Sequence, residues 1–258
     1  MEEQLLTAYL CFWLAVLGAV LGSFLDCAAS RWAAGDPHPF AGRSRCSSCG
    51  HALGARDLVP VFSFLLRRGR CRYCGAGIPA GCLAAELAGA AVFACLGARF
   101  GWTPELGQWL VWAALLLALS LTDWAKRIIP DKLLLALAAN RAVWFFVLGH
   151  GAREALEAAK ALAVPAALLA LVLAMEKLLG REAMGGGDVK LLAVLALYLG
   201  WAELFLTLLA GCLLGLLWAA LTGGKTGTAM PFGPFLAAGA VLTVCCGGPV
   251  LDWYFGLL

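Results

Sequence analysis

Apolar runs about as long as a bilayer is thick recur along nearly the whole chain, and they restrict the fold more than any other feature. A helix needs about 20 mostly apolar residues to cross the hydrocarbon core. Of the 258 residues, 62% are hydrophobic and 14% are charged, whereas soluble domains carry about 25% charged residues. The sequence therefore predicts an all-α polytopic membrane protein, surrounded by a lipid bilayer. The net charge of +3 is too small to indicate a nucleic-acid partner.

The apolar runs predict about eight transmembrane helices. The first run, residues 5–25, follows an acidic start instead of the basic region of a signal peptide, so we expect it to stay in the mature protein. The other seven are expected at about 81–99, 107–123, 131–149, 160–178, 188–201, 204–221 and 234–256. The run 188–201 is short, at about 21 Å against a core of about 30 Å. The number of helices around 188–222 is therefore open.

Arginines are concentrated in the one long polar stretch, residues 26–79. They are Arg31, Arg43, Arg45, Arg56, Arg67, Arg68, Arg70 and Arg72. Because Lys and Arg are enriched in cytoplasmic loops, this insert is expected in the cytoplasm and both termini on the opposite side. We therefore expect three parts: a first transmembrane helix (1–25), a cytoplasmic insert (26–79) and a membrane helical bundle (80–258).

The insert carries two CxxC pairs, Cys46-Ser-Ser-Cys49 and Cys71-Arg-Tyr-Cys74, with 21 residues between them. A glycine follows each pair, as the tight turn of a zinc knuckle requires. Four thiolates in two such turns suit a closed, tetrahedral, structural Zn²⁺ site. The alternative, a pair of disulfides, conflicts with a reducing cytoplasm. We therefore predict that Cys46, Cys49, Cys71 and Cys74 bind one zinc ion.

Two aspartates are expected at the cytoplasmic boundary of the membrane. Asp123 closes one predicted helix, and Asp188 opens another directly after three glycines, Gly185–Gly187. A carboxylate at a helix start is favoured by the helix dipole, so a structural role is open for Asp188 and for Asp131. The same dipole disfavours Asp123 at a helix end. Asp123 is therefore predicted to have a functional role.

The two carboxylates suggest a specific chemistry. When two carboxylates share a partly desolvated site they cannot both ionise easily, so one acts as a base while the other holds a proton. The base activates a water molecule against a peptide carbonyl, and the acid protonates the leaving nitrogen. We therefore predict that Asp123 and Asp188 form an acid–base pair, of a kind that can hydrolyse a peptide bond.

Glu86 lies about a turn inside the second predicted helix. A carboxylate at this depth is costly in lipid, so its side chain should face the helical bundle. A functional role and a structural pairing with an arginine are both open.

The order and spacing of these motifs resemble those of the type IV prepilin peptidases, integral membrane aspartic proteases of the GxGD type. These enzymes serve bacterial type IV pilus, type II secretion and competence systems. The match extends over nearly the full length, and the resemblance implies that Asp123 and Asp188 are the catalytic aspartates. Its further short motifs are Gly22-Ser-Phe-Leu25, Leu58-Val-Pro-Val-Phe-Ser-Phe-Leu-Leu66, Gly69-Arg-Cys71, Ile129-Pro-Asp131 and Pro231-Phe-Gly-Pro234.

By this resemblance, the substrates are type IV prepilins or pseudopilins. The chain would remove their basic leader peptide at the cytoplasmic boundary of the bacterial plasma (inner) membrane. Many members of the family then methylate the new N-terminus, so S-adenosylmethionine is implied as a cofactor beside zinc. Two positions depart from the family's pattern: Asp26 stands where Asn is usual, and Gly81-Cys82 where Tyr-Pro is usual. Both departures concern methylation more than proteolysis. No Rossmann glycine fingerprint indicates a methyl-donor pocket.

Two other functions remain possible from the residues alone. One is another GxGD intramembrane protease of the presenilin type, but such proteins carry no CxxC insert after the first helix. The other is a membrane transporter with a zinc-stabilised cytoplasmic domain, in which the aspartates relay protons. A transporter is often built from an internal repeat, and no repeat is found in this sequence.

Overall fold

The computed structural model describes residues 2–180, 185–223 and 230–256. In these residues the regular elements are helices, with two isolated β-bridges in the insert. The helices are packed in two compact units, residues 1–125 and 126–258. This confirms the predicted all-α class with a four-cysteine insert after the first helix.

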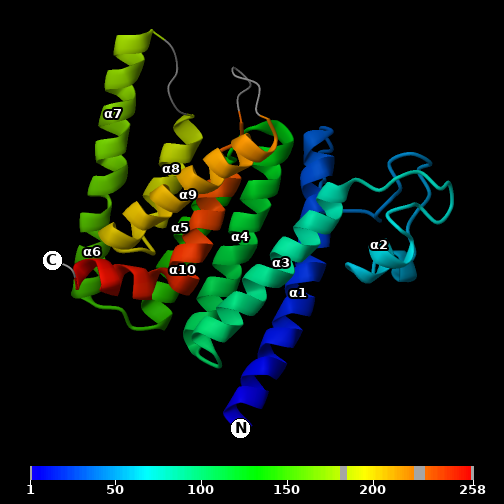
Figure 1. Cartoon of the computed structure of the whole chain (residues 1–258), viewed down its shortest axis with the longest axis horizontal. Helices are drawn as coiled ribbons and strands as arrows, with labels where there is room; N and C mark the ends of the chain where they lie inside the picture. Colours follow the sequence, from blue (N-terminus) through cyan, green and yellow to red (C-terminus); the bar gives the residue numbers. More distant parts are fainter. Residues whose placement is uncertain (1, 181–184, 224–229, 257–258) are drawn as a thin grey trace. The chain divides into compact units, whose positions relative to one another are not determined.

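The first unit holds the N-terminal half of the chain (Figure 1). Its elements are α1 (Glu2–Ala33), the short 3₁₀ turn η1 (Ala55–Asp57), α2 (Phe62–Leu66), α3 (Ala80–Phe100) and α4 (Pro104–Lys126). The second unit holds α5 (Asp131–Val147), α6 (Ala152–Ala161), α7 (Ala163–Leu179), α8 (Gly186–Leu195), α9 (Trp201–Leu221) and α10 (Gly233–Phe255).

Six stretches of helix in the described residues are long and apolar enough to cross a membrane. They are α1, α3, α4, the stretch Ala152–Leu178 that joins α6 and α7, α9 and α10. The helices α5 and α8 have 17 and 10 residues, which gives about 26 Å and 15 Å against a core of about 30 Å. The expected number of about eight crossings therefore stays a prediction.

α1 is longer than the predicted run 5–25, because it continues to Ala33. Its 32 residues extend over about 48 Å, so about 18 Å of the helix lies outside a 30 Å core. The polar residues after position 25 end the apolar run without ending the helix. The boundaries 1–25, 26–79 and 80–258 remain a prediction about membrane topology.

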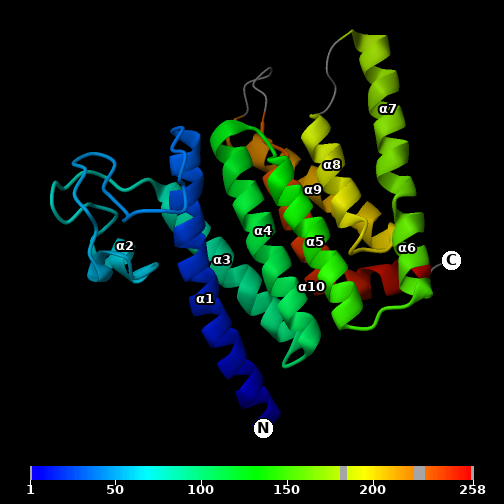
Figure 2. The same cartoon turned by 180° about the vertical axis from the view of Figure 1, so that it is seen from behind.

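Glycines let α1 and α3 pack closely, and the two helices lie side by side in both views (Figures 1 and 2). Gly18 and Gly22 are one turn apart on α1, and both are buried. A Cβ atom added at Gly18 would collide with the backbone of Gly89, and one at Gly22 with the backbone of Ala85. Small residues four positions apart are typical of helix pairs in membranes, because they bring the backbones into contact.

Replacing Gly18 by alanine is expected to destabilise the first unit by about 1–3 kcal/mol, the usual cost of overfilling a packed contact. Gly81→Ala is the control, because Gly81 lies on α3 with open space around its Cα, so the same change there meets no neighbour. Denaturant unfolding in detergent, followed by circular dichroism, measures the difference. Equal stability of the two variants would contradict this packing.

In the second unit, α8 is short but enclosed. It packs against α5, α7 and α10, and the side chains of Leu191, Leu192 and Leu195 are fully buried. α9 and α10 meet closely, since a Cβ at Gly239 would lie 2.6 Å from the carbonyl oxygen of Thr207. The start of α8 is therefore held by its own helical neighbours rather than by a loop.

Candidate active site and metal centre

Asp123 lies in the last turn of α4, three residues before the helix ends at Lys126. The residue is only 5% exposed, and it follows the fully buried Leu119 and the buried Thr122. The hydroxyl of Thr122 donates to the carbonyl of Leu119 at 2.9 Å, within the helix. A carboxylate near the negative end of a helix dipole does not stabilise its own helix. This burial adds to the reason for expecting a chemical role.

Asp188 is the third residue of α8, and its side chain is half-buried. Its N–H donates to the carbonyl of Gly185 at 3.0 Å, and its carboxylate lies at the favourable end of the helix dipole. A Cβ at Gly187 would lie 3.1 Å from the Cβ of Ile129, so a larger residue would crowd this close approach. The glycines thus seat the start of α8 against the segment that precedes α5.

A salt bridge also joins the start of α8 to the start of α5. The Nζ of Lys190 donates to Oδ1 of Asp131 at 2.9 Å. Asp131 is the first residue of α5, and its side chain makes this bond instead of capping the helix. Because the two side chains are 76% and 61% exposed, such a pair stabilises by about 0–1 kcal/mol. The bridge orients the starts of α5 and α8 more than it stabilises them.

The two predicted catalytic residues belong to different units, Asp123 to the first and Asp188 to the second. Their pairing therefore stays a prediction. Within the second unit, the start of α8 does contact Ile129, which follows Asp123 by six residues in the chain.

The four predicted zinc ligands do come together. The sulfur atoms of Cys46, Cys49, Cys71 and Cys74 all lie within 4.8 Å of one another, and those of Cys46 and Cys74 are 3.9 Å apart. All four are free thiols. Tetrahedral zinc with Zn–S bonds of about 2.3 Å places its sulfurs about 3.8 Å apart. The cluster therefore has the composition and spacing of a structural zinc site.

Both CxxC pairs form the same turn. The N–H of Gly50 donates to the carbonyl of Cys46 at 2.9 Å, and that of Gly75 donates to the carbonyl of Cys71 at 3.0 Å. Gly50 and Gly75 have φ values of +69° and +71°, a region that favours glycine. This confirms the sequence-based reason for the glycine after each pair.

The backbone of the two turns also shifts the pKa values of the cysteine thiols. The backbone N–H groups of Cys49 and Ser48 lower the pKa of Cys46 to about 6. At Cys74 the N–H of Ala76 lowers the pKa, but desolvation and the three neighbouring thiols outweigh it and raise the pKa to about 11. One thiol thus ionises easily and another resists, as expected when negative charges crowd together. A divalent cation would remove that repulsion.

Two side chains of the membrane helices hold the insert in place, and neither contact was expected from the sequence. Arg31, in the last turn of α1, donates to the carbonyls of Ala41 at 2.6 Å and Arg43 at 2.7 Å. Glu86, buried on α3, accepts the N–H of Val61 at 2.7 Å. Among the described residues, the partner of Glu86 is thus a backbone group rather than an arginine. Its role in holding the insert favours the structural alternative.

The two departures from the family's pattern interact with each other. Asp26 is on α1 and Cys82 is on α3, and their side chains are close enough to interact electrostatically. Two unusual residues therefore share one contact at the insert end of these helices. Their positions in the sequence, 56 residues apart, gave no signal of this contact.

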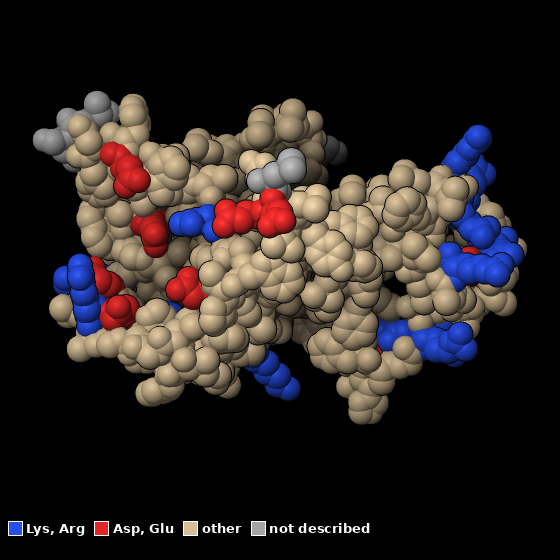
Figure 3. Space-filling view, turned by 90° about the horizontal axis from the view of Figure 1, so that it is seen from below, with Lys and Arg blue, Asp and Glu red and all other residues tan. Residues whose placement is uncertain are grey.

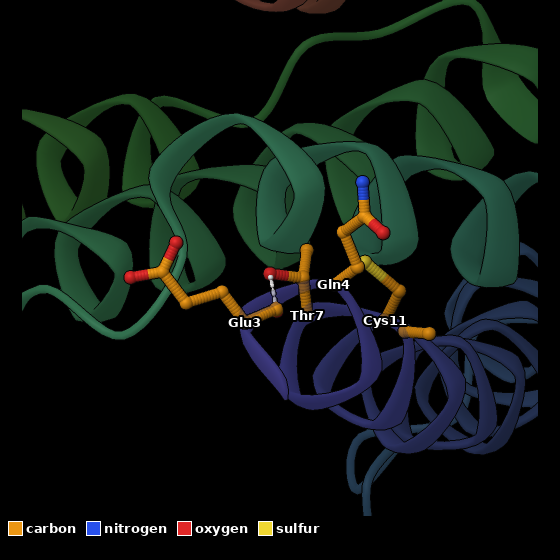
Figure 4. A pocket seen from close by; sticks show the side chains of 5 residues that line it. Glu3, Gln4, Thr7 and Cys11 are labelled. Atoms are coloured by element: carbon orange, nitrogen blue, oxygen red, sulfur yellow. Dashed lines mark hydrogen bonds between the residues drawn. The ribbon is translucent and has the colours of Figure 1, made fainter. Parts of the chain in front are cut away.

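A shallow hollow at the other end of α1 offers less chemistry (Figure 4). Its lining residues are Glu3, Gln4, Thr7, Ala8 and Cys11. The hydroxyl of Thr7 donates to the carbonyl of Glu3 at 2.9 Å, so it serves the helix itself. One carboxylate and one thiol without a partnered base do not make a reactive group.

Two family models match the chain. The bacterial peptidase A24 N-terminal domain matches residues 16–100, and the type IV leader peptidase family matches residues 110–220. No solved structure was found to match.

Curated relatives from several bacteria match over most of their length, and they carry the same name, prepilin leader peptidase/N-methyltransferase. The protein from Bacillus subtilis is 34% identical, over 93% of this chain and 95% of the relative. The protein from Dichelobacter nodosus is 35% identical, over 80% and 72%. The protein from Pseudomonas aeruginosa is 34% identical, over 82% and 74%.

Proposed function

Since this chain belongs to the type IV leader peptidase family, we propose that it is a membrane aspartic endopeptidase that cleaves the leader peptide from type IV prepilins or pseudopilins. Asp123 and Asp188 are its catalytic pair. The family also weighs against the alternatives of a transporter and of a presenilin-type protease.

The observation that carries this proposal is the burial of Asp123 at the end of a membrane helix. Helix stability alone gives no reason for a carboxylate there. Asp188 supports the proposal differently, because the three residues directly before it are glycines, which add no side chains of their own beside its carboxylate. A peptide substrate in extended form needs such room beside the reacting groups.

In this mechanism one carboxylate is ionised and the other is protonated. The ionised group takes a proton from a water molecule as that water attacks the peptide carbonyl. The protonated group gives its proton to the leaving nitrogen, so the C–N bond breaks and two chain ends form. The pair returns to one shared proton after the products leave. The reaction requires no nucleophilic side chain and no catalytic metal.

We place the site at the cytoplasmic boundary of the bacterial inner membrane. The support is the asymmetry of charge, because seven of the eight arginines at 26–79 follow α1 in the loop before α3 and positive charge marks the cytoplasmic side. The four cysteines of the insert then lie in a reducing compartment, which prevents them from forming disulfides.

This orientation predicts a labelling pattern in intact cells. An impermeant thiol reagent added outside should react with a cysteine tag placed after Leu258 and should not react with a tag at Gly35, an exposed turn in the insert. Permeabilised cells, in which both tags react, serve as the control. Labelling at Gly35 in intact cells would reverse the proposed topology.

The names of the relatives also support methylation of the new N-terminus, with S-adenosylmethionine as the methyl donor. When bound, this cofactor supplies a methyl group to an amine. No residue of the chain is assigned to it. The contact between Asp26 and Cys82, at two positions where the family's residues differ, lies in the half of the chain that the N-terminal family model covers.

The test is to incubate the purified protein with a prepilin and to weigh the products. We expect two fragments, and we expect the mature fragment to gain about 14 Da when S-adenosylmethionine is present. Cleavage without that gain in mass would support the proposed peptidase activity and refute the proposed methyltransferase activity. Absence of cleavage by protein that retains its fold would refute the proposed function as a whole.

A further inference from the structure

The short helix α2 exposes an apolar face. Phe62, Leu65 and Leu66 are 67%, 60% and 83% exposed, and they lie three and four residues apart, on one side of the helix. Val59, just before the helix, is 45% exposed. A contiguous apolar surface of this kind on a small polar insert normally has something packed against it.

An unusual turn sets the direction of α2. The N–H of Phe62 donates to the carbonyl of Pro60 at 2.6 Å, which makes Val61 the centre of a γ-turn. Val61 has a φ of 63° and a ψ of −52°, a conformation that is rare and strained for a branched residue. The N–H of Val61 donates to the carboxylate of Glu86. Glu86 thus holds a strained turn that would otherwise relax, and the turn decides where the apolar face of α2 lies.

Glu86 also fixes the depth of α2 in the membrane. It lies six residues inside α3, which is about 9 Å along the helix. α3 has 21 residues and is about 31 Å long, close to the thickness of the hydrocarbon core. In both views α2 lies on the side of the insert that faces back along α1 toward its N-terminal end (Figures 1 and 2). Through the bond between Val61 and Glu86, the start of α2 is therefore held within about 9 Å of the insert-side end of α3, on the hydrocarbon side of the headgroup layer.

A second contact places the insert at the same level. The ring of Phe40, in the insert, stacks on the ring of Phe24, on α1, with centroids 6.3 Å apart. Phe40 and Phe24 remain 66% and 48% exposed. Phe24 is on a membrane-crossing helix, nine residues before its end. The surface of α1 that faces lipid thus continues onto the insert.

The charge around α2 is complementary to an anionic bilayer. Residues 34–79 contain seven arginines and two aspartates, Asp36 and Asp57, and the side chain of Asp57 is engaged by Arg67. In Figure 3, Lys and Arg side chains gather over the insert. Arg68 and Arg70, just after α2, are exposed. Each arginine near an anionic membrane surface contributes about 1 kcal/mol of attraction.

We propose that α2 is an interfacial anchor: Phe62, Leu65 and Leu66 enter the leaflet on the insert's side of the membrane, and Arg68 and Arg70 bind anionic phospholipid headgroups. Glu86 is the positioning residue that holds α2 at this depth through Val61. An amphipathic segment with an apolar face and flanking arginines binds lipid in this way. The anchor is independent of the peptidase proposal, because it requires only that α1 and α3 cross the membrane.

Photocrosslinking of the full chain tests this anchor. p-Benzoyl-phenylalanine replaces Phe62 in protein reconstituted into vesicles of phosphatidylglycerol and phosphatidylethanolamine. Irradiation should yield chain–phospholipid adducts, detected by mass. The matched control carries the same group in place of Tyr73, an exposed aromatic residue of the second cysteine turn. We expect at least about fivefold more lipid adduct at position 62 than at 73, equivalent to about 1 kcal/mol.

Two further variants test whether α2 contacts lipid or another partner. Arg68→Gln should lower the share of phosphatidylglycerol in the adducts about fivefold, while Glu86→Ala should lower all lipid adducts at position 62. Only variants that keep the wild-type unfolding midpoint are compared. Equal lipid adducts at positions 62 and 73 would overturn the proposal, as would adducts with an added prepilin in place of lipid. The second result would make α2 a substrate-docking face.

Discussion

Asp123→Asn and Asp188→Asn are each expected to remove essentially all cleavage of a prepilin while leaving the fold intact. Asparagine has nearly the volume of aspartate, but it can neither accept a proton from water nor return one to the leaving nitrogen. Loss of one general acid–base group alone typically costs about 10²–10⁴ in rate, and the reaction here loses half of its catalytic pair. The cleavage rate, measured by product mass over time, gives the result. Wild-type activity should fall at both ends of a bell-shaped pH profile, because one carboxylate must be ionised and the other protonated.

Asp252→Asn is the matched control for these two changes. Asp252 is an exposed aspartate near the end of α10, so its replacement should leave cleavage unchanged. The unfolding midpoints of all three variants should stay close to wild type, since none removes a packed apolar group. Substantial cleavage by either the Asp123 or the Asp188 variant would rule out the aspartic mechanism.

The double change Cys46→Ser/Cys71→Ser is expected to release the zinc and unfold the insert. Among residues 34–79, all of which the structure describes, Cys71 is the only buried residue. The insert therefore has no apolar core that could hold it without the metal. Structural zinc in small domains supplies about 10–16 kcal/mol at pH 7, far more than the few hydrogen bonds of the two turns. Elemental analysis should show about one zinc per wild-type chain and none in the variant, and limited proteolysis should cut the variant between α1 and α3.

Cys212→Ser/Cys246→Ser provides a matched double control. Both residues are exposed free thiols on membrane helices of the second unit, so zinc content and protease resistance should not change. We expect cleavage to fall in the Cys46/Cys71 variant through loss of the insert's fold and not through loss of chemistry. Zinc retained in that variant would refute the assignment of the four ligands.

Properties that depend on local composition and spacing were predictable from the sequence. A run of apolar residues needs no knowledge of its neighbours to be stable in lipid, so the helical membrane class followed from the runs alone. The CxxC spacing with a following glycine specifies a turn within five residues, and both turns formed as expected. Asp123 could be singled out because a carboxylate at a helix end is unfavourable for a local reason.

Long-range contacts were decided only by the tertiary structure. Glu86 could have faced an arginine or a substrate, and its actual partner is a backbone N–H freed by a strained turn 25 residues earlier. The contact of Asp26 with Cys82 depends on how closely Gly18 and Gly22 let α1 approach α3. The end of α1 lies beyond the end of its apolar run, because the helix continues through Arg31, which binds the insert. In each case the structure is decided by the interaction energy between groups on different helices. The order of side chains along the chain does not show which of these groups come into contact.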